Sequence, residues 1–250
     1  MPVWLEAGLW GLLGGGALVL GAGVTWLVRV PDLIVAWIMA FGAGVLISAL
    51  AFDLLDEAER SGGLAPTAIG FLGGACAYVA ANAALARRGA RHRKRSGDQQ
   101  PSEDQVQGSG AAIAIGALLD GVPESVVLGL SLLNGGVGTA VLAAIFISNV
   151  PEGLSSAAGM KRAGRGAGYV FGVWGGIALA SGLSALMGGL LLEGAPPTAI
   201  AVITAVAAGA ILAMVADTMI PEAFERAHVV TGLIATLGFL TAFSIERIGG

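Results

Sequence analysis

Charged residues are scarce in this chain: Asp, Glu, Lys and Arg make up only 12% of its 250 residues, whereas 56% are apolar. Soluble domains contain about 25% charged residues, so the composition excludes an ordinary soluble protein and indicates an integral membrane protein. Glycine, in contrast, is abundant, with 41 residues. Small residues let helices approach one another closely in lipid, which favours a helical bundle.

Cysteine and histidine are almost absent. The single cysteine, Cys76, excludes an internal disulfide and a thiolate metal cluster, and a buried, inert thiol is its simplest interpretation. The two histidines, His92 in a polar stretch and His228 at the edge of an apolar one, are not expected to be ligands. No Ser–His pair lies within an apolar segment, so we do not expect an enzyme. A metal site in this chain would have to use oxygen ligands.

Long apolar runs dominate the chain, and eight of them reach the roughly 20 residues that a bilayer crossing needs. We predict spans at 4–28, 33–58, 64–87, 110–133, 136–160, 168–192, 197–224 and 228–248. Most connections are short, such as Asn134-Gly135. The long connection 88–108 opens with basic residues and continues with Gly, Asp, Gln, Pro and Ser, as in a disordered linker. The sequence therefore predicts one transmembrane domain, 1–250, containing a disordered basic loop at 88–108.

The basic residues favour one orientation. If the N-terminus lies outside, eleven of the thirteen Lys and Arg fall in or beside cytoplasmic loops, and only Arg60 and Arg247 do not. The positive-inside rule then predicts a multi-pass protein of the cell membrane with both termini outside the cytoplasm. The lipid bilayer is thus an expected partner, and no nucleic acid is expected. A homodimer is compatible with the sequence, which does not decide the oligomeric state.

Two pairs of similar short segments suggest an internal repeat. Asp120-Gly-Val-Pro-Glu-Ser in span 4 resembles Ser148-Asn-Val-Pro-Glu-Gly in span 5, and the acidic stretch 53–59 in span 2 resembles 217–225 in span 7. Spans 2 and 7 run in opposite directions, as in the inverted repeats of secondary transporters. We therefore predict an all-α membrane protein in a 3+2+3 arrangement, with spans 1–3 and 6–8 as inverted repeats around spans 4–5. Coincidence between short strings is the alternative.

Two proline–glutamate pairs lie in the middle of spans 4 and 5. A carboxylate at bilayer depth is costly unless it is paired, hydrated or bound to an ion, and proline frees a backbone carbonyl four residues earlier. Asp120 precedes Glu124 by four residues and Asn149 precedes Glu152 by three, so each pair shares a helix face. We predict that these four residues bind a divalent cation. Kinked helices with a protonated, hydrogen-bonded glutamate are the alternative.

Further polar residues extend this prediction. Ser148 lies next to Asn149 and is an additional candidate ligand. Asp53, Asp217 and Glu222 are candidates for an ion path, with Asp53 recruiting the ion outside and the other two releasing it inside. Hydrated positions near the ends of the spans are the alternative interpretation for these acids.

These motifs resemble the ZIP (Zrt/Irt-like) family of divalent metal transporters. The resemblance rests on the two Pro-Glu motifs, on Leu54-Leu55-Asp56-Glu57-Ala58 in span 2 and on Met219-Ile220-Pro221-Glu222-Ala223 in span 7, and it covers essentially the whole chain. It implies eight spans, outside termini, a variable cytoplasmic loop after span 3 and a binuclear metal site between spans 4 and 5.

The chain also departs from the family pattern. Asp120 and Ser148 stand where the family has a histidine (or glutamine, in span 5), Gly121 replaces an asparagine, and no glutamate stands at Ala185 in span 6. The resemblance therefore implies one metal site rather than two, although two stay open, and an oxygen shell less selective for zinc. We expect transport of zinc, manganese, iron or cadmium toward the cytoplasm, with metal as substrate and no organic cofactor. The alternative is a degraded site that carries protons or another cation, or a non-transporting sensor or partner.

Overall fold

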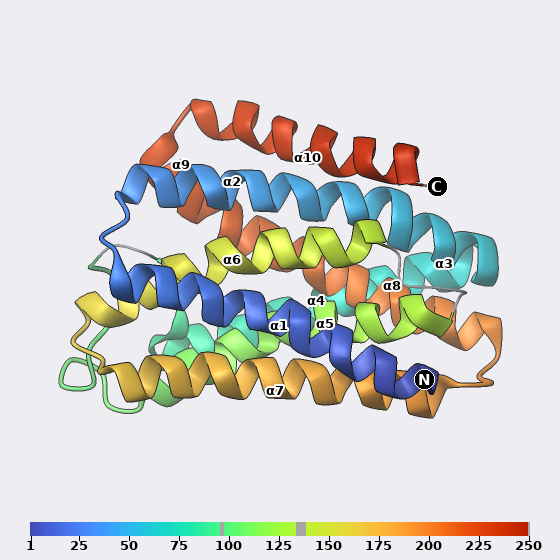
Figure 1. Cartoon of the computed structure of the whole chain (residues 1–250), viewed down its shortest axis with the longest axis horizontal. Helices are drawn as coiled ribbons and strands as arrows, with labels where there is room; N and C mark the ends of the chain where they lie inside the picture. The colour runs from blue at the N-terminus through green and yellow to red at the C-terminus, as the bar shows by residue number, and fades with distance from the viewer. Residues whose placement is uncertain (96–97, 134–138, 250) are drawn as a thin grey trace.

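The computed structural model describes residues 1–95, 98–133 and 139–249 (Figure 1). Over these ranges no strand occurs, and eight helices are long and apolar enough to cross a bilayer, which confirms the predicted number. They are α1 (Val3–Leu27), α2 (Asp32–Ala49) with η1 (Leu50–Leu54) and α3 (Leu55–Gly62), α4 (Leu64–Leu85) with η2 (Ala86–Ala90), α5 (Ser109–Leu133), α6 (Thr139–Arg162), α7 (Ala167–Leu192), α8 (Pro197–Met214) with η3 (Val215–Met219) and α9 (Ile220–Ala227), and α10 (Val230–Gly249). The predicted connection Asn134-Gly135, and residues 96–97 of the predicted loop, lie outside the described residues.

Proline and glycine define several helix ends. α2 starts directly after Pro31 and α8 starts at Pro197, positions where a missing backbone N–H costs nothing. Gly63 has φ of 83° between α3 and α4, a conformation that an L side chain would strain. Pro123 and Pro151, in contrast, lie inside α5 and α6, and both helices continue through them.

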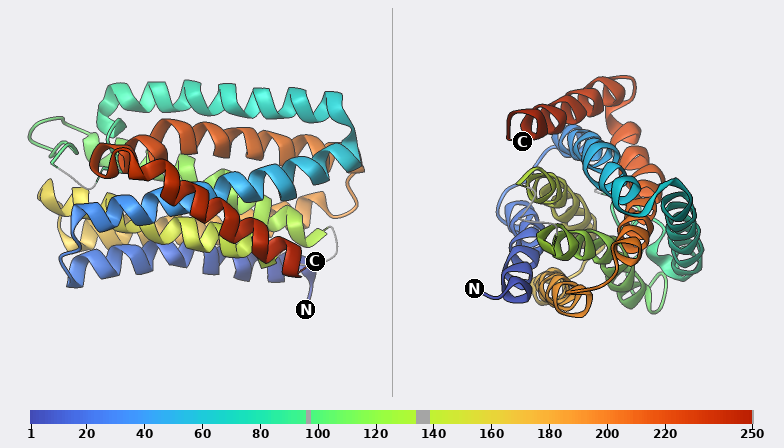
Figure 2. Two further views of the ribbon diagram at one scale, coloured as in Figure 1. Left: turned by 90° about the horizontal axis from the view of Figure 1, so that it is seen from above. Right: turned by 90° about the vertical axis from the view of Figure 1, so that its right-hand side faces the viewer.

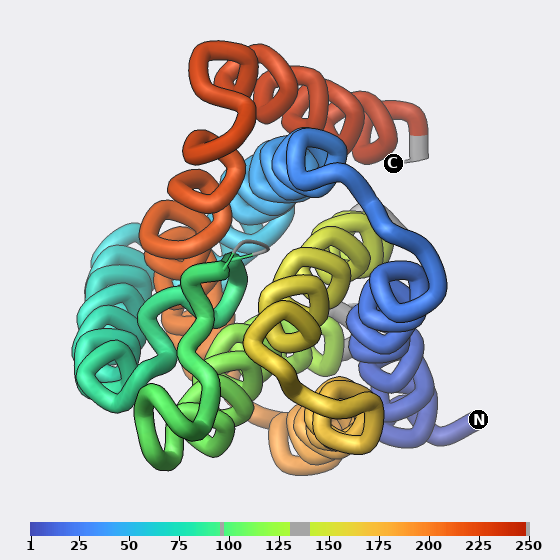
Figure 3. Tube along the Cα trace, turned by 90° about the vertical axis from the view of Figure 1, so that its left-hand side faces the viewer, coloured from blue at the N-terminus to red at the C-terminus, as the bar shows by residue number. Residues whose placement is uncertain are grey.

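Both termini lie at one end of the bundle, and the segment that follows η2 lies at the other end (Figure 1). Figure 3 looks from the latter end and shows this segment, in green, against the ends of the helices rather than away from them. The shared end of the termini is what an even number of crossings requires. Which end faces the cytoplasm stays a prediction from the basic residues.

The second and seventh crossings are built alike. Each consists of an 18-residue α-helix, a five-residue π-helical segment and an eight-residue α-helix. The π-helical segments η1 and η3 contain Asp53 and Asp217 respectively. π-helical turns inside longer helices are frequent at functional sites.

The packing of these crossings is also alike. α4 packs along α8, α10 packs along α2, and α1 packs along both α7 and α6 (Figure 2). Glycine permits these close approaches: a Cβ at Gly209 would overlap the carbonyl oxygen of Phe71 in α4, and a Cβ at Gly238 would overlap that of Phe41 in α2. Cys76, which we expected to be buried, is exposed on α4, because α4 lies at the edge of the bundle.

Candidate functional site

The four residues predicted to bind a cation are all buried near the middle of α5 and α6. Asp120, Glu124, Asn149 and Glu152 are 1%, 2%, 4% and 3% exposed. The ammonium group of Lys94 joins the two helices, because its Nζ lies 2.8 Å from a carboxylate oxygen of Glu152 and 3.5 Å from one of Asp120. The structure therefore places carboxylates from both helices around one cationic group.

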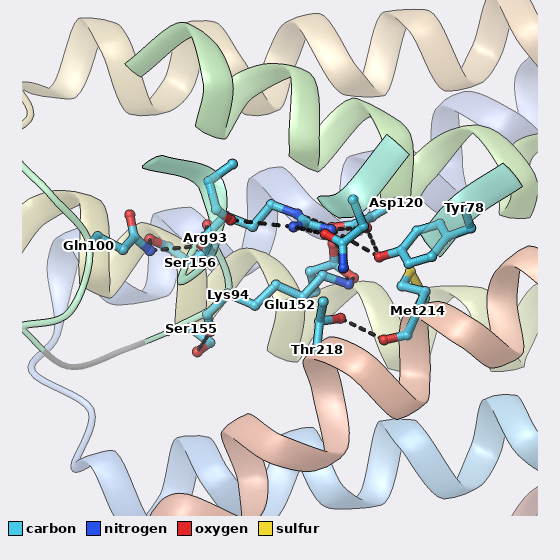
Figure 4. A network of polar contacts seen from close by, with 12 residues as sticks. Tyr78, Arg93, Lys94, Gln100, Asp120, Glu152, Ser155, Ser156, Met214 and Thr218 are labelled. Atoms are coloured by element: carbon cyan, nitrogen blue, oxygen red, sulfur yellow. Dashed lines mark hydrogen bonds and ion pairs between the residues drawn. The ribbon is translucent and has the colours of Figure 1, made fainter. Parts of the chain in front are cut away.

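Arg93 makes two of the hydrogen bonds to the carboxylate of Asp120. Its Nε and Nη2 donate to the two carboxylate oxygens of Asp120 at 2.8 Å each, and the hydroxyl of Tyr78 donates to one of these oxygens at 2.7 Å (Figure 4). The remaining nitrogen, Nη1, donates to the side-chain oxygen of Asn82 at 2.7 Å. Two parallel charge-assisted hydrogen bonds form the strongest arrangement that guanidinium and carboxylate groups adopt. Asp120 is thus fully engaged by protein groups.

Arg93 and Lys94 belong to the segment 88–108, for which the sequence predicts a disordered loop. In the structure these two residues are instead only 1% and 3% exposed. The reason is electrostatic: buried carboxylates are costly until a positive group neutralises them, and the basic segment supplies two such groups. The prediction treated these cations mainly as topology signals, and the structure instead places both beside buried carboxylates.

Hydrogen bonds also fix the backbone of this segment. Ser155 and Ser156 of α6 donate from their hydroxyls to the carbonyl oxygens of Lys94 and Arg93, at 2.5 Å in both cases. The amide of Gln100 donates to the carbonyl oxygen of Arg93 at 2.8 Å. Buried carbonyl groups need such partners, so the segment is held by its main chain as well as by its charges.

The third consecutive cation, Arg95, reaches the seventh crossing. Its Nη1 lies 3.4 Å from a carboxylate oxygen of Glu222, and it also pairs with Glu225. A carboxylate oxygen of Glu222 also lies 3.1 Å from the hydroxyl oxygen of Ser155, within hydrogen-bond distance. Three successive basic residues therefore pair with acids of α5, α6 and α9, and Glu222 joins the same network as the residues predicted to bind a cation.

Glu124 differs from the other two buried acids. Among the described residues neither of its carboxylate oxygens has a hydrogen bond of normal geometry, although Asn149, Lys94 and Glu152 lie close enough to act on it. Two cationic side chains thus face three carboxyl groups, Asp120, Glu124 and Glu152. The cluster retains the capacity to take up further positive charge.

The other predicted residues lie less centrally. Ser148 is buried and donates to the carbonyl oxygen of Ile145 at 3.0 Å, within its own helix. Asn149 donates to the carbonyl oxygen of Gly14 in α1 at 3.0 Å. Asp53 is half-buried on η1, and Asp217 is exposed on η3, so Asp217 does not join the buried acids. Across residues 1–95, 98–133 and 139–249, no three His, Cys, Asp or Glu side chains converge as metal ligands in this arrangement.

Several residues of the network escaped the sequence analysis. Tyr78 contacts Asp120, and Ser155 and Ser156 contact the backbone of residues 93–94 (Figure 4). Neither Pro-Glu motif predicts these contacts. A signal was present: Tyr78 is one of only two tyrosines, in an otherwise apolar span. Two glycines also make room for the segment, because a Cβ at Gly116 would lie 2.5 Å from Cδ of Arg93, and one at Gly159 would overlap the carbonyl oxygen of Arg95.

A second anchor holds the end of the segment nearest α5. Arg165 pairs with Glu103 at 2.8 Å, and the backbone amide of Gly110 donates to the same carboxylate at 3.1 Å. The hydrogen bond from Arg165 lowers the pKa of Glu103 to about 2 from an ordinary value of 4.5, and the amides of Gly108 and Gly110 add to this effect. Because the pKa is lowered on folding, the anchor contributes fully above about pH 4.5 and is lost as the pH falls toward 2.

We therefore expect the segment 98–108, most of which is exposed already, to lose its anchor on Arg165 and become more flexible between pH 5 and pH 2. Pepsin cleavage, normalised at each pH to a free peptide of the same sequence, should accelerate over this range. Glu103→Gln removes the titrating group, so its normalised cleavage should change less with pH than that of the parent. An identical pH profile for the two proteins would contradict the role of Glu103.

The arrangement can stabilise positive charge in an apolar environment, on acids contributed by three crossings of the bundle. It offers oxygen ligands but no imidazole or thiolate from the described residues. In comparisons with known proteins, no family model matches the chain and no curated protein matches it.

Proposed function

We propose that the protein transports a divalent metal cation, zinc or a related metal such as manganese, iron or cadmium, toward the cytoplasm through the acids of α5 and α6. The observation that carries this proposal is the burial of Asp120, Glu124 and Glu152 together, around groups that are themselves cations. Carboxylates within a membrane are costly and rare, and they mark ion pathways. Glu124 has no ion pair and no hydrogen bond of normal geometry among the described residues, so it leaves one carboxyl to be neutralised.

The proposed route continues from this cluster in both directions. Asp53, on the π-helical segment of the second crossing, recruits the ion from outside. Glu222 accepts it on the cytoplasmic side and Asp217 assists in its release. The position of Glu222 supports this order, since it is 3% exposed and shares the partner Ser155 with the segment that binds Glu152.

We further propose that the fold is a 3+2+3 arrangement of inverted repeats and that the chain is a member of the ZIP family in the cell membrane, with both termini outside. The identical division of the second and seventh crossings supports the repeat. So does the pairing of α4 with α8 and of α10 with α2, because a twofold axis relating spans 1–3 to spans 6–8 exchanges these contacts.

Metal uptake into proteoliposomes tests the proposal. Glu124→Gln combined with Glu152→Gln removes two of the three carboxylates while keeping side-chain volume. We expect uptake to fall by at least about 100-fold, since changes even to outer-shell partners cost 10- to 100-fold in metal sites. Glu193→Gln, at an exposed glutamate between α7 and α8, is the control and should transport normally. Equal uptake by the double variant and the parent would refute transport through these acids.

A second function is favoured by one observation, the complete engagement of Asp120 by Arg93 and Tyr78. If this pairing is permanent, the site is a structural ion pair, and the protein carries protons or another cation, or acts as a sensor or partner without transport. In that case neither the parent nor the double variant takes up divalent metal. Proton flux measured with a pH-sensitive dye in the same vesicles then separates a proton carrier from a protein that carries nothing.

A further inference from the structure

Three consecutive basic residues pair, one after the other, with the successive acids of the proposed route. Arg93 pairs with Asp120 of α5, Lys94 with Glu152 of α6, and Arg95 with acids of α9. We propose that residues 93–95 form a tethered competitor that occupies the cation site and its cytoplasmic exit, so that the protein inhibits itself until a divalent metal displaces the tether. This inference rests on the proposed function and adds the regulation of the same site.

The charge balance makes such an exchange feasible. Arg93 and Lys94 together carry the two positive charges of one divalent ion, so replacing both side chains by one ion leaves the charge of the buried cluster unchanged. The cost of burying uncompensated carboxylates is therefore avoided both before and after the exchange. Removal of only one cation would leave a charge uncompensated, which favours release of the segment as a unit.

The docked position is built into the helices that carry the site. Ser155 and Ser156, which follow Glu152 by one helical turn, donate to the carbonyl oxygens of Lys94 and Arg93. Gly116 and Gly159 leave space for the stem of Arg93 and the backbone of Arg95. Hydroxyl donors on α6 and glycines on α5 and α6 thus fit this segment closely, which a chance contact between a flexible loop and the bundle would not explain.

The same contacts close the route toward the loop end of the bundle. Arg95, whose side chain is 20% exposed, pairs with Glu222 and donates to the carbonyl oxygen of Pro221 at 3.2 Å. Glu222 is the acid to which the ion would pass from Glu152. While the segment is docked, neither the site nor its exit can accept a metal ion. The apparent affinity for metal then equals the intrinsic affinity multiplied by the fraction of molecules in which the segment is released.

The first test uses the two lysines of the chain, Lys94 and Lys161. A lysine-specific endoprotease can cut only after these residues, so cleavage after buried Lys94 reports release, and cleavage after exposed Lys161 is the internal control. Zinc or manganese chloride should accelerate cleavage after Lys94 by about tenfold relative to Lys161. Potassium chloride of equal ionic strength should not, which separates displacement from screening. Cleavage after Lys94 that no metal accelerates would overturn the inference.

The second test displaces the segment without altering any charge. Gly159→Leu would push against the backbone of Arg95. The matched control is Gly172→Leu in α7, where no atom of the described residues lies within 4 Å of an added Cβ. In proteoliposomes Gly159→Leu should lower the apparent KM for metal by about tenfold and expose Lys94 without metal. An unchanged KM together with protected Lys94 would overturn the inference.

The two proposals fail differently. If the parent and all variants show no metal uptake, yet zinc or manganese exposes Lys94, then transport is refuted while competition between metal and tether stands. If uptake depends on Glu124 and Glu152 but Lys94 stays protected at saturating metal, transport stands and the tether is refuted. Because the protease test uses the unmodified protein, misfolding of Gly159→Leu cannot obscure the outcome.

Discussion

Replacement of Arg93 by alanine, in the absence of divalent metal, is expected to lower the free energy of unfolding by about 3–5 kcal/mol, the usual cost of removing one partner of a buried ion pair. Asp120 would lose both hydrogen bonds from the guanidinium group and keep the single one from Tyr78 and the longer contact with Lys94. Unfolding by denaturant in detergent, followed by tryptophan fluorescence, measures the difference. Arg91→Ala, which removes an exposed neighbouring cation, should change stability by less than about 0.5 kcal/mol.

The companion double variant, Arg93→Met with Asp120→Leu, separates the loss of the ion pair from the loss of side-chain packing. Once both charges are removed, no uncompensated carboxylate remains, so we expect most of the lost stability to return. Divalent metal should also reduce the loss in Arg93→Ala if the ion replaces the missing charge. Equal stability of Arg93→Ala and Arg91→Ala would show that Arg93 does not neutralise Asp120.

Gly153→Val, next to Glu152, is expected to destabilise the bundle by about 3 kcal/mol, at the upper end of the cost of overpacking. A Cβ at this position would overlap the carbonyl oxygen of Leu18 in α1, and a Cβ at Gly21 of α1 would overlap that of Val150 in α6. The two helices therefore touch backbone to backbone on both sides of the contact. Neither backbone can yield without separating the helices.

The yield of folded protein on size-exclusion chromatography, together with denaturant unfolding, measures this effect. Gly176→Val is the control, because no atom of the described chain lies within 4 Å of a Cβ built at this glycine of α7. We expect Gly176→Val to fold like the parent. A Gly153→Val variant of parental stability would mean that α1 and α6 are not in close contact.

The features of the site that could be predicted depend on residues within a single helix. Asp120 and Glu124, like Asn149 and Glu152, share helix faces because of their spacing, and their burial follows from their position within apolar segments. Glu222, a candidate for the ion path from its Pro-Glu motif, is buried as well, and its role in an ion path stays a prediction. These residues could be found because helix periodicity and the cost of charge in lipid act within one segment.

The unpredicted part was long-range. The basic run at 93–95 has the composition of a solvated loop, and only the arrangement of α5, α6 and α9 supplies the carboxylates that bury it. Asp217 lies in the π-helical segment η3 and is exposed, which agrees with the hydrated position given as its alternative, and its role in an ion path stays a prediction. The spacing of residues within one segment predicts neither which acids a cation pairs with nor which way a side chain on a π-helical segment faces.

The sequence by itself determined that the chain forms eight apolar helices and that acidic groups lie within them, because bilayer thickness and helix geometry constrain each segment separately. Only the tertiary structure decided what neutralises those acids. Ion pairing acts between groups far apart in the sequence and depends on which helices lie side by side, so the partners of Asp120 and Glu152 emerged only once the bundle had brought Arg93 and Lys94 to them.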